Sequence, residues 1–184
     1  MSRVPLSRLV MPLLAMLALT FHAAMVLIGA QPIQRQLVKF EANGVLRIDP
    51  QEVVKITLTR GGRQIALARS GEGGWISELS GAVKPVVAAH LDTAVKMLHR
   101  SAPVRELAPE DLSGVDTHPF GLEEPAVVAA LSGPSGHLLT VEFGAHNPEG
   151  FLQYMRIRGD PKVYLMSRFI GAEWVAALEG LETR

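Results

Sequence analysis

Short apolar and alternating runs fill the stretch from residue 120 to residue 166, separated by turns rich in glycine, proline and asparagine. The clearest run, LTVEF at residues 139–143, places its apolar side chains on one side and Thr140 and Glu142 on the other. Such alternation is typical of a half-buried strand in an antiparallel sheet. We therefore predict a β-meander over this stretch.

A second group of short strands is predicted nearer the N-terminus. Residues 53–60 alternate, Gly61–Gly62 forms a two-residue turn that permits positive φ, and residues 63–69 return as the second strand of a hairpin. Residues 75–77 give a short third strand, and residues 45–48 a further short strand. Because this group and the meander share a strand–turn–strand layout, the soluble part is predicted to consist of two similar halves.

Apolar residues at helical spacing predict two helices that pack on these strands. The first runs from Pro85 to Arg100, with proline suited to its first turn, and Pro103 prevents its continuation. The second follows Ser167, which is a suitable N-cap residue. The two apolar faces consist of Val87, Leu91, Ala94, Val95 and Leu98, and of Ile170, Trp174, Ala177, Leu178 and Leu181. The fold class is therefore α+β, with antiparallel hairpin and meander sheets and two packed helices.

The stretch Leu9–Ala30 contains 22 residues and no Asp, Glu, Lys or Arg. As a helix it would span roughly 30 Å, the thickness of a bilayer's hydrocarbon core. A cleaved signal peptide is the alternative, but its apolar region is usually shorter, and Ile28 suits a cleavage site after Ala30 poorly. We therefore expect a transmembrane helix that contacts lipid through residues 9–30. His22 within it would contact a partner helix, or is a tolerated neutral polar residue.

The charge flanking this stretch bears on its orientation. Arg3 and Arg8 precede it and Arg35, Lys39 and Arg47 follow it, but a long following domain crosses a membrane largely regardless of its charge. We expect residues 1–30 to form a cytoplasmic tail and transmembrane helix, residues 31–52 a connector and residues 53–184 a periplasmic domain. The expected location is a bacterial inner membrane.

Composition excludes several classes of protein. Lys+Arg and Asp+Glu are both 18, so the net charge is zero, which argues against nucleic-acid binding. Aromatic residues make up only 5%, too few for a platform on which bases stack. The absence of cysteine excludes disulfides, thiolate metal sites, iron–sulfur clusters and covalent c-type haem attachment.

No motif points to catalysis, a cofactor or a metal. The histidines lack metal-ligand spacing, and adjacent Glu123 and Glu124 cannot face each other as an acid–base pair. The glycine-rich segment 71–74 lacks a following phosphate-binding Lys-Ser/Thr and is interpreted as a hairpin turn. We predict no catalytic, cofactor-binding or metal-binding residues, and no enzyme.

One group of polar residues is a candidate docking patch. Tyr154, Arg156, Arg158 and Lys162 are expected on the outer face of the sheet near Glu142. Arginine and tyrosine are enriched at protein interfaces. Cross-strand charge pairing on a solvated face is the alternative.

Five phrases extend, with the closing helix, over residues 48–178: VVKITLTRGGRQIALAR, GGWIS, FGLEEP, VEFGAHNPEG and QYMRIRGDPKVYLM. Together they resemble the domain-of-unknown-function 4340 family. FGL-x-x-P and GDPKVYL are the most specific. The resemblance implies a membrane-anchored or exported bacterial α+β domain, in some cases beside gliding-type ABC-transporter components, and implies no catalytic residue. Members often carry repeated copies of the domain, whereas this chain has one.

We expect a non-catalytic, single-pass membrane protein that is an accessory or assembly subunit of a larger membrane complex. Its periplasmic domain would dock on partner proteins. The alternative is a membrane-tethered module that binds or senses a small ligand for a transporter, which needs a concave pocket. An enzyme is the third class, and it needs a deep pocket lined by His146, Glu142 or Arg156.

Overall fold

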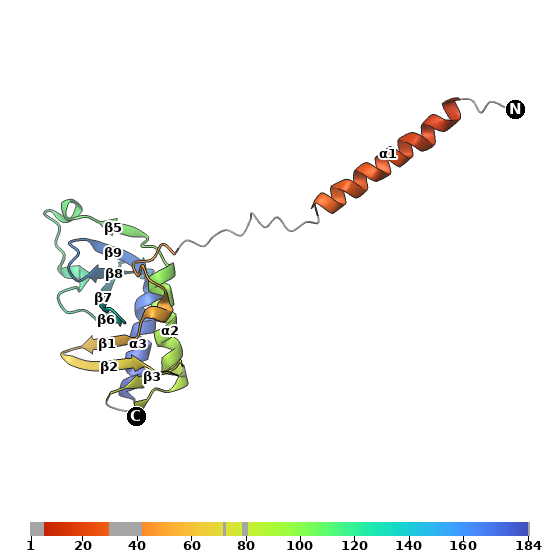
Figure 1. The fold of residues 1–184 in the computed structure, drawn as a ribbon. Helices are drawn as coiled ribbons and strands as arrows, with labels where there is room; N and C mark the ends of the chain where they lie inside the picture. Colours follow the sequence, from red (N-terminus) through yellow and green to blue (C-terminus); the bar gives the residue numbers. More distant parts are fainter. Residues whose placement is uncertain (1–5, 30–41, 72, 79–80, 184) are drawn as a thin grey trace. The chain divides into compact units, whose positions relative to one another are not determined.

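The computed structural model describes residues 6–29, 42–71, 73–78 and 81–183 (Figure 1). The chain divides into two compact units, residues 1–40 and residues 41–184. Residues 31–41 of the expected connector lie outside the described residues.

The first unit contains the helix α1 (Leu6–Gly29), which is 24 residues long and includes Pro12. Its described side chains, from Val10 to Val26, are all exposed, and they carry no charge. Across the part of the chain that the structure describes, no helix is long and apolar enough to cross a membrane.

The second unit is built on one nine-stranded sheet in the order β4-β3-β2-β1-β6-β7-β8-β9-β5. Every neighbouring pair is antiparallel. The strands are β1 (Lys55–Arg60), β2 (Arg63–Arg69), β3 (Trp75–Ser77), β4 (Gly81–Ala82), β5 (Arg105–Leu107), β6 (Val127–Gly133), β7 (Gly136–His146), β8 (Leu152–Ile157) and β9 (Val163–Ser167). The predicted α+β class with antiparallel strands is confirmed, and the hairpin and the meander form one continuous sheet.

Apart from the edge strand β5, each half of this sheet is a run of four strands followed by a helix. Strands β1–β4 precede α2 (Pro85–Arg100), and β6–β9 precede α3 (Arg168–Glu182). The halves meet where β1 pairs antiparallel with β6. The helices are antiparallel as well, because Lys84 Nζ donates to the Thr183 carbonyl at 3.0 Å while His90 Nδ1 lies 2.7 Å from Glu173. The order of four strands and a helix thus occurs twice, and the similarity of the two halves stays a prediction.

The main core lies between the sheet and the two helices, which lie side by side on one of its faces (Figure 1). The alternation of β1 and β2 directs Ile56, Leu58, Ile65 and Leu67 into this core. The helix residues predicted to face it, with Leu181 only partly buried, do so: Val87, Leu91, Ala94, Val95, Leu98, Ile170, Trp174, Ala177, Leu178 and Leu181.

A smaller core lies on the opposite face of the sheet, over β7–β9. The segment with the 3₁₀ turns η3 (Pro109–Leu112) and η4 (His118–Phe120) covers this face. Phe120, Leu122 and Val163 are buried together there. Because both faces are covered, residues 139–144 of β7 are buried without alternation.

The strand predicted at residues 45–48 is wrong. The backbone N–H groups of Gly44 and Leu46 donate to the carbonyls of His99 and Leu98, at 2.9 and 3.0 Å. This segment therefore satisfies carbonyls at the C-terminal end of α2 instead of joining the sheet. Leu46 is buried in the main core, so residues assigned to the connector pack with the domain.

Smaller differences concern caps and short elements. Ser167 occupies the N-cap position of α3, but its side chain makes no capping hydrogen bond. Strand β4 and the 3₁₀ turn η2 (Pro50–Glu52) were not predicted. Strand β5 pairs with β9 at one edge of the sheet.

Candidate functional site

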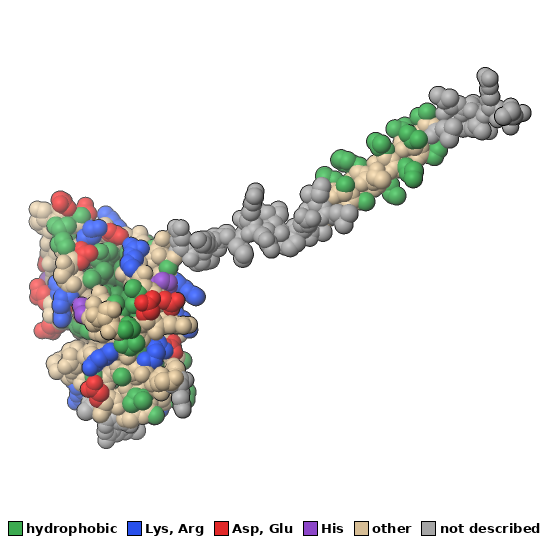
Figure 2. Space-filling model, viewed as in Figure 1, with side chains coloured by type: hydrophobic (Ala, Val, Ile, Leu, Met, Phe, Trp, Pro, Cys, Tyr) green, Lys and Arg blue, Asp and Glu red, His purple; other side chains and the backbone are tan. Residues whose placement is uncertain are grey.

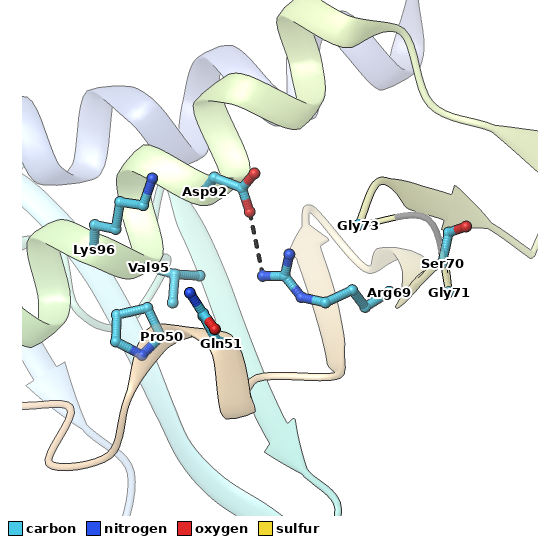
Figure 3. Close-up of a pocket in the computed structure, with 9 residues that line it drawn as sticks. All are labelled: Pro50, Gln51, Arg69, Ser70, Gly71, Gly73, Asp92, Val95 and Lys96. Carbon is cyan, nitrogen blue, oxygen red and sulfur yellow. Dashed lines mark hydrogen bonds and ion pairs between the residues drawn. The ribbon is translucent and has the colours of Figure 1, made fainter.

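A pocket of about 440 Å³ lies between η2, the β2–β3 turn and α2 (Figure 3). We call it the α2 pocket. Its volume is within the range of small-molecule sites. The lining residues are Pro50, Gln51, Arg69, Ser70, Gly71, Gly73, Asp92, Val95 and Lys96.

Arg69 forms one wall of the α2 pocket and is held by three different groups. Its Nη2 donates to Asp92 Oδ1 at 3.2 Å, and its Nε donates to the Val53 carbonyl at 3.1 Å. Its guanidinium lies 4.4 Å from the centre of the Trp75 ring. Trp75 Nε1 donates to the same oxygen of Asp92 at 3.0 Å. This wall is therefore preorganised, and its carboxylate is already neutralised by Arg69.

Lys96 supplies the second cation of the α2 pocket. It lies one helical turn after Asp92 on α2 and is exposed. Within the described part of the chain, no hydrogen bond or ion pair engages Lys96. The described lining thus carries two cations and one carboxylate, which favours a small anion as ligand. The sequence did not predict this pocket, since its residues come from three separate segments.

The predicted docking residues Arg156 and Arg158 converge on one carboxylate, and we call the three residues the Glu142 cluster. Glu142 is buried, and its Oε2 accepts from Arg156 Nη2 at 2.6 Å and Nε at 2.9 Å. Its Oε1 accepts from Arg158 Nη2 at 2.8 Å and Nε at 3.1 Å. Burial raises the pKa of Glu142, but the hydrogen bonds and charges of the two arginines together outweigh it and leave the pKa below its ordinary value.

The other two predicted docking residues have different contacts. The Tyr154 ring stacks on Phe120 with centroids 4.1 Å apart and planes inclined by 14°. Lys162 Nζ pairs with Glu106 on β5 at 2.9 Å, and this hydrogen bond and charge raise the pKa of Lys162. The structure therefore brings Arg156 and Arg158 to Glu142 and places Lys162 in a separate ion pair.

Tyr164 and Asp160 form a further linked pair beside Lys162. Tyr164 Oη donates to Asp160 Oδ2 at 2.7 Å. Burial and this hydrogen bond raise the pKa of Tyr164, and the same bond with that from the Lys162 backbone N–H lowers the pKa of Asp160. These bonds fix the turn before β9.

His22 of α1 is hydrogen-bonded within its own helix. Its Nδ1 lies 2.9 Å from the Ala18 carbonyl, and its ring meets Phe21 edge to face. Among the described residues, no group of three or more His, Asp or Glu side chains is placed to hold a metal ion.

The adjacent carboxylates Glu123 and Glu124 are exposed and line a hollow of about 460 Å³ with His118 and Gly121. Neither this hollow nor the α2 pocket is lined by the residues that an enzyme would have used, which are His146, Glu142 and Arg156.

No family model matches the chain, and neither does any curated protein or solved structure. The resemblance to the domain-of-unknown-function 4340 family is therefore carried by the quoted phrases alone.

Proposed function

We propose that this chain is a non-catalytic, single-pass protein of a bacterial inner membrane, with its N-terminus in the cytoplasm and its α+β unit in the periplasm. It serves as an accessory or assembly subunit of a larger membrane complex. The α+β unit docks on partner proteins of that complex. The resemblance noted in the sequence favours the same setting.

The surface of α1 carries this proposal. Its described side chains are apolar apart from Thr20 and His22, and Figure 2 shows hydrophobic side chains along it. Thr20 Oγ1 donates to the Met16 and Leu17 carbonyls, at 3.0 and 2.9 Å, and His22 bonds to the Ala18 carbonyl. A helix that is apolar all round, with its polar side chains bonded to its own backbone, is suited to lipid or to a protein core.

The length of the uncharged stretch favours lipid over a protein core as the surroundings of α1. The described side chains end at Val26, whereas the uncharged stretch of the sequence extends from residue 9 to residue 30. Its 22 residues exceed the roughly 20 that a transmembrane helix needs.

The docking surface is proposed to include the Glu142 cluster and Lys162. Arg158 holds Glu142 with one edge of its guanidinium and is still 65% exposed. Lys162 is partly exposed, although it pairs with Glu106. A guanidinium that is fixed by one carboxylate and open on its other side loses little freedom when it binds a partner's carboxylate.

Purification of the full chain from its native membranes in mild detergent tests this proposal, with mass spectrometry to identify what accompanies it. We expect stoichiometric membrane subunits, and a reduced yield of them for the double variant Arg158→Ala/Lys162→Ala. Lys55→Ala is the matched control, because Lys55 forms a similar exposed pair with Glu78 at 3.3 Å. Recovery of the unmodified chain alone would contradict the accessory role.

The α2 pocket favours a second candidate, a membrane-tethered module that binds a small ligand. Trp75 contacts both Arg69 and Asp92, so an anion at Lys96 should alter its fluorescence. We expect inorganic phosphate to change the emission of the full chain in detergent, and Lys96→Ala to abolish the change. Lys84→Ala, at the other end of α2, is the control. An unchanged emission would exclude small anions of this kind from the pocket.

A further inference from the structure

Two exposed phenylalanines lie on adjoining segments at one end of the α+β unit, where the end of the β7–β8 turn meets the start of α3. Phe151 immediately precedes β8 and is 72% exposed, and Phe169 lies in the first turn of α3 and is 60% exposed. Arg168 joins them. Its backbone N–H donates to the Phe151 carbonyl at 3.2 Å, and its guanidinium lies 5.3 Å from the centre of the Phe169 ring. We call these three residues the aromatic tip.

Among the described residues of the other half, the positions that correspond to Phe169 and Phe151 carry no aromatic side chain. Phe169 is the second residue of α3, and the second residue of α2 is Val86. Phe151 ends the β7–β8 turn, and the corresponding β2–β3 turn ends with Gly74. Folding of the repeated topology therefore does not require aromatic side chains at these positions.

The chain enters the unit at the same end of the helix pair. Gly44 donates to the carbonyl of His99, one residue before the C-terminal end of α2. Because α2 and α3 are antiparallel, this end of α2 lies beside the N-terminal end of α3, where Phe169 lies. Only the fourteen residues 30–43 separate Gly44 from Gly29 of α1, and a fully extended segment of that length reaches roughly 50 Å at most.

We propose that the aromatic tip binds the surface of the lipid bilayer in which α1 is anchored. The two phenylalanine rings enter the interfacial region, and the Arg168 guanidinium pairs with the phosphate of an anionic headgroup. Solvent-exposed aromatic rings beside an arginine fit this boundary better than they fit water. The tip depends on the anchor proposed above to hold it near lipid.

Single cysteines test the tip directly, because the native chain has none. Phe169→Cys and Phe151→Cys, each labelled with an environment-sensitive fluorophore, are compared with Val86→Cys. Val86 is the matched control, since it is 62% exposed and occupies the corresponding position of α2. The full chain is reconstituted in liposomes of phosphatidylcholine with phosphatidylglycerol. Quenchers are a nitroxide lipid within the bilayer and iodide in the water.

We expect the labels at residues 169 and 151 to show blue-shifted emission and to be quenched by the nitroxide lipid, and the label at residue 86 to be quenched by iodide. Removing phosphatidylglycerol should weaken the lipid quenching, and Arg168→Gln should abolish that dependence on anionic lipid. Iodide quenching of all three labels would overturn the lipid contact. So would labels shielded in native membranes but not in liposomes, since a protein would then cover the tip.

Flotation of the same liposomes separates the two proposals. If the chain floats but its labels are exposed to water, the proposed lipid contact of the aromatic tip is wrong and the proposed anchor still stands. A chain that does not float overturns the anchor, and the tip with it. Unchanged circular dichroism of each variant shows that the substitution at an exposed position has not unfolded the unit.

Discussion

At the scale of single residues, Glu142 combines a charged carboxylate with a buried position. It alternates outward on β7, as the pattern at residues 139–143 predicts, yet it is buried because the segment around Phe120 and Leu122 covers that face. Two arginines satisfy its oxygens. A buried carboxylate of this kind is tolerated only when it is paired and hydrogen-bonded.

We predict that Glu142→Gln lowers the free energy of unfolding of the full chain in detergent by about 1–2 kcal/mol at pH 7. The loss is modest because both arginines are partly exposed and screened by solvent. The pKa of Glu142 lies below its ordinary value of 4.5, so its contribution is complete above that pH and is lost as the pH falls through the lowered value.

Urea unfolding at pH 7 and at several values below pH 4.5 measures this effect. The unmodified chain should lose more stability on acidification than Glu142→Gln does. Glu78→Gln is the control, since Glu78 is exposed and forms an ordinary surface pair with Lys55. Equal acid sensitivity of the unmodified chain and Glu142→Gln would show that the cluster does not couple folding to pH.

At the scale of elements, η4 packs closely on β7 and so covers the second face of the sheet. Gly144 makes this contact possible, because a Cβ built there would lie 2.1 Å from the Phe120 carbonyl oxygen and 3.0 Å from Leu122 Cδ2. The backbone of the covering segment thus lies directly on the strand. No other residue fits without displacement of one element.

We predict that Gly144→Ala destabilises the full chain in detergent by about 1–3 kcal/mol, the usual effect of overpacking. Gly74→Ala is the matched control, since its Cβ would meet no atom within 4 Å. Denaturant midpoints of the two variants give the comparison. A Gly144→Ala midpoint equal to that of Gly74→Ala would contradict the close packing of η4 on β7.

Elements with a long periodic pattern could be predicted from the sequence, and those set by tertiary contacts could not. The bounds of α2 at Pro85 and Arg100 agree with the prediction. Five core residues recur at helical spacing there, Pro85 suits the first turn of a helix, and Pro103 prevents its continuation. Strand β4 has only two residues and hence no alternation. The apolar residues at 45–48 resemble a strand, but their backbone bonds to the end of α2.

The candidate sites likewise depend on tertiary contacts that the sequence does not predict. Alternation along β8 places Tyr154 and Arg156 on one face, but it cannot show that Glu142 becomes buried or that Lys162 pairs with β5. The α2 pocket was missed altogether. Its residues have no sequence motif, and only the fold brings η2, the β2–β3 turn and α2 together.

At the scale of the whole molecule, the α+β unit is a repeated topology with unequal halves. The sheet is continuous through β1 and β6, and one half carries the Glu142 cluster and the aromatic tip. The other half carries the α2 pocket. Binding functions are thus proposed at different places on a shared scaffold, and the proposed aromatic tip depends on the proposed membrane anchor.

The most direct measurement of that central claim is the fate of the full chain when native membranes are washed at alkaline pH. Such a wash removes proteins bound only at the surface and leaves proteins that span the bilayer. The proposed anchor at residues 9–30 predicts that the chain stays with the washed membranes and floats with them in a density gradient. Release of the chain into the wash would contradict a transmembrane anchor.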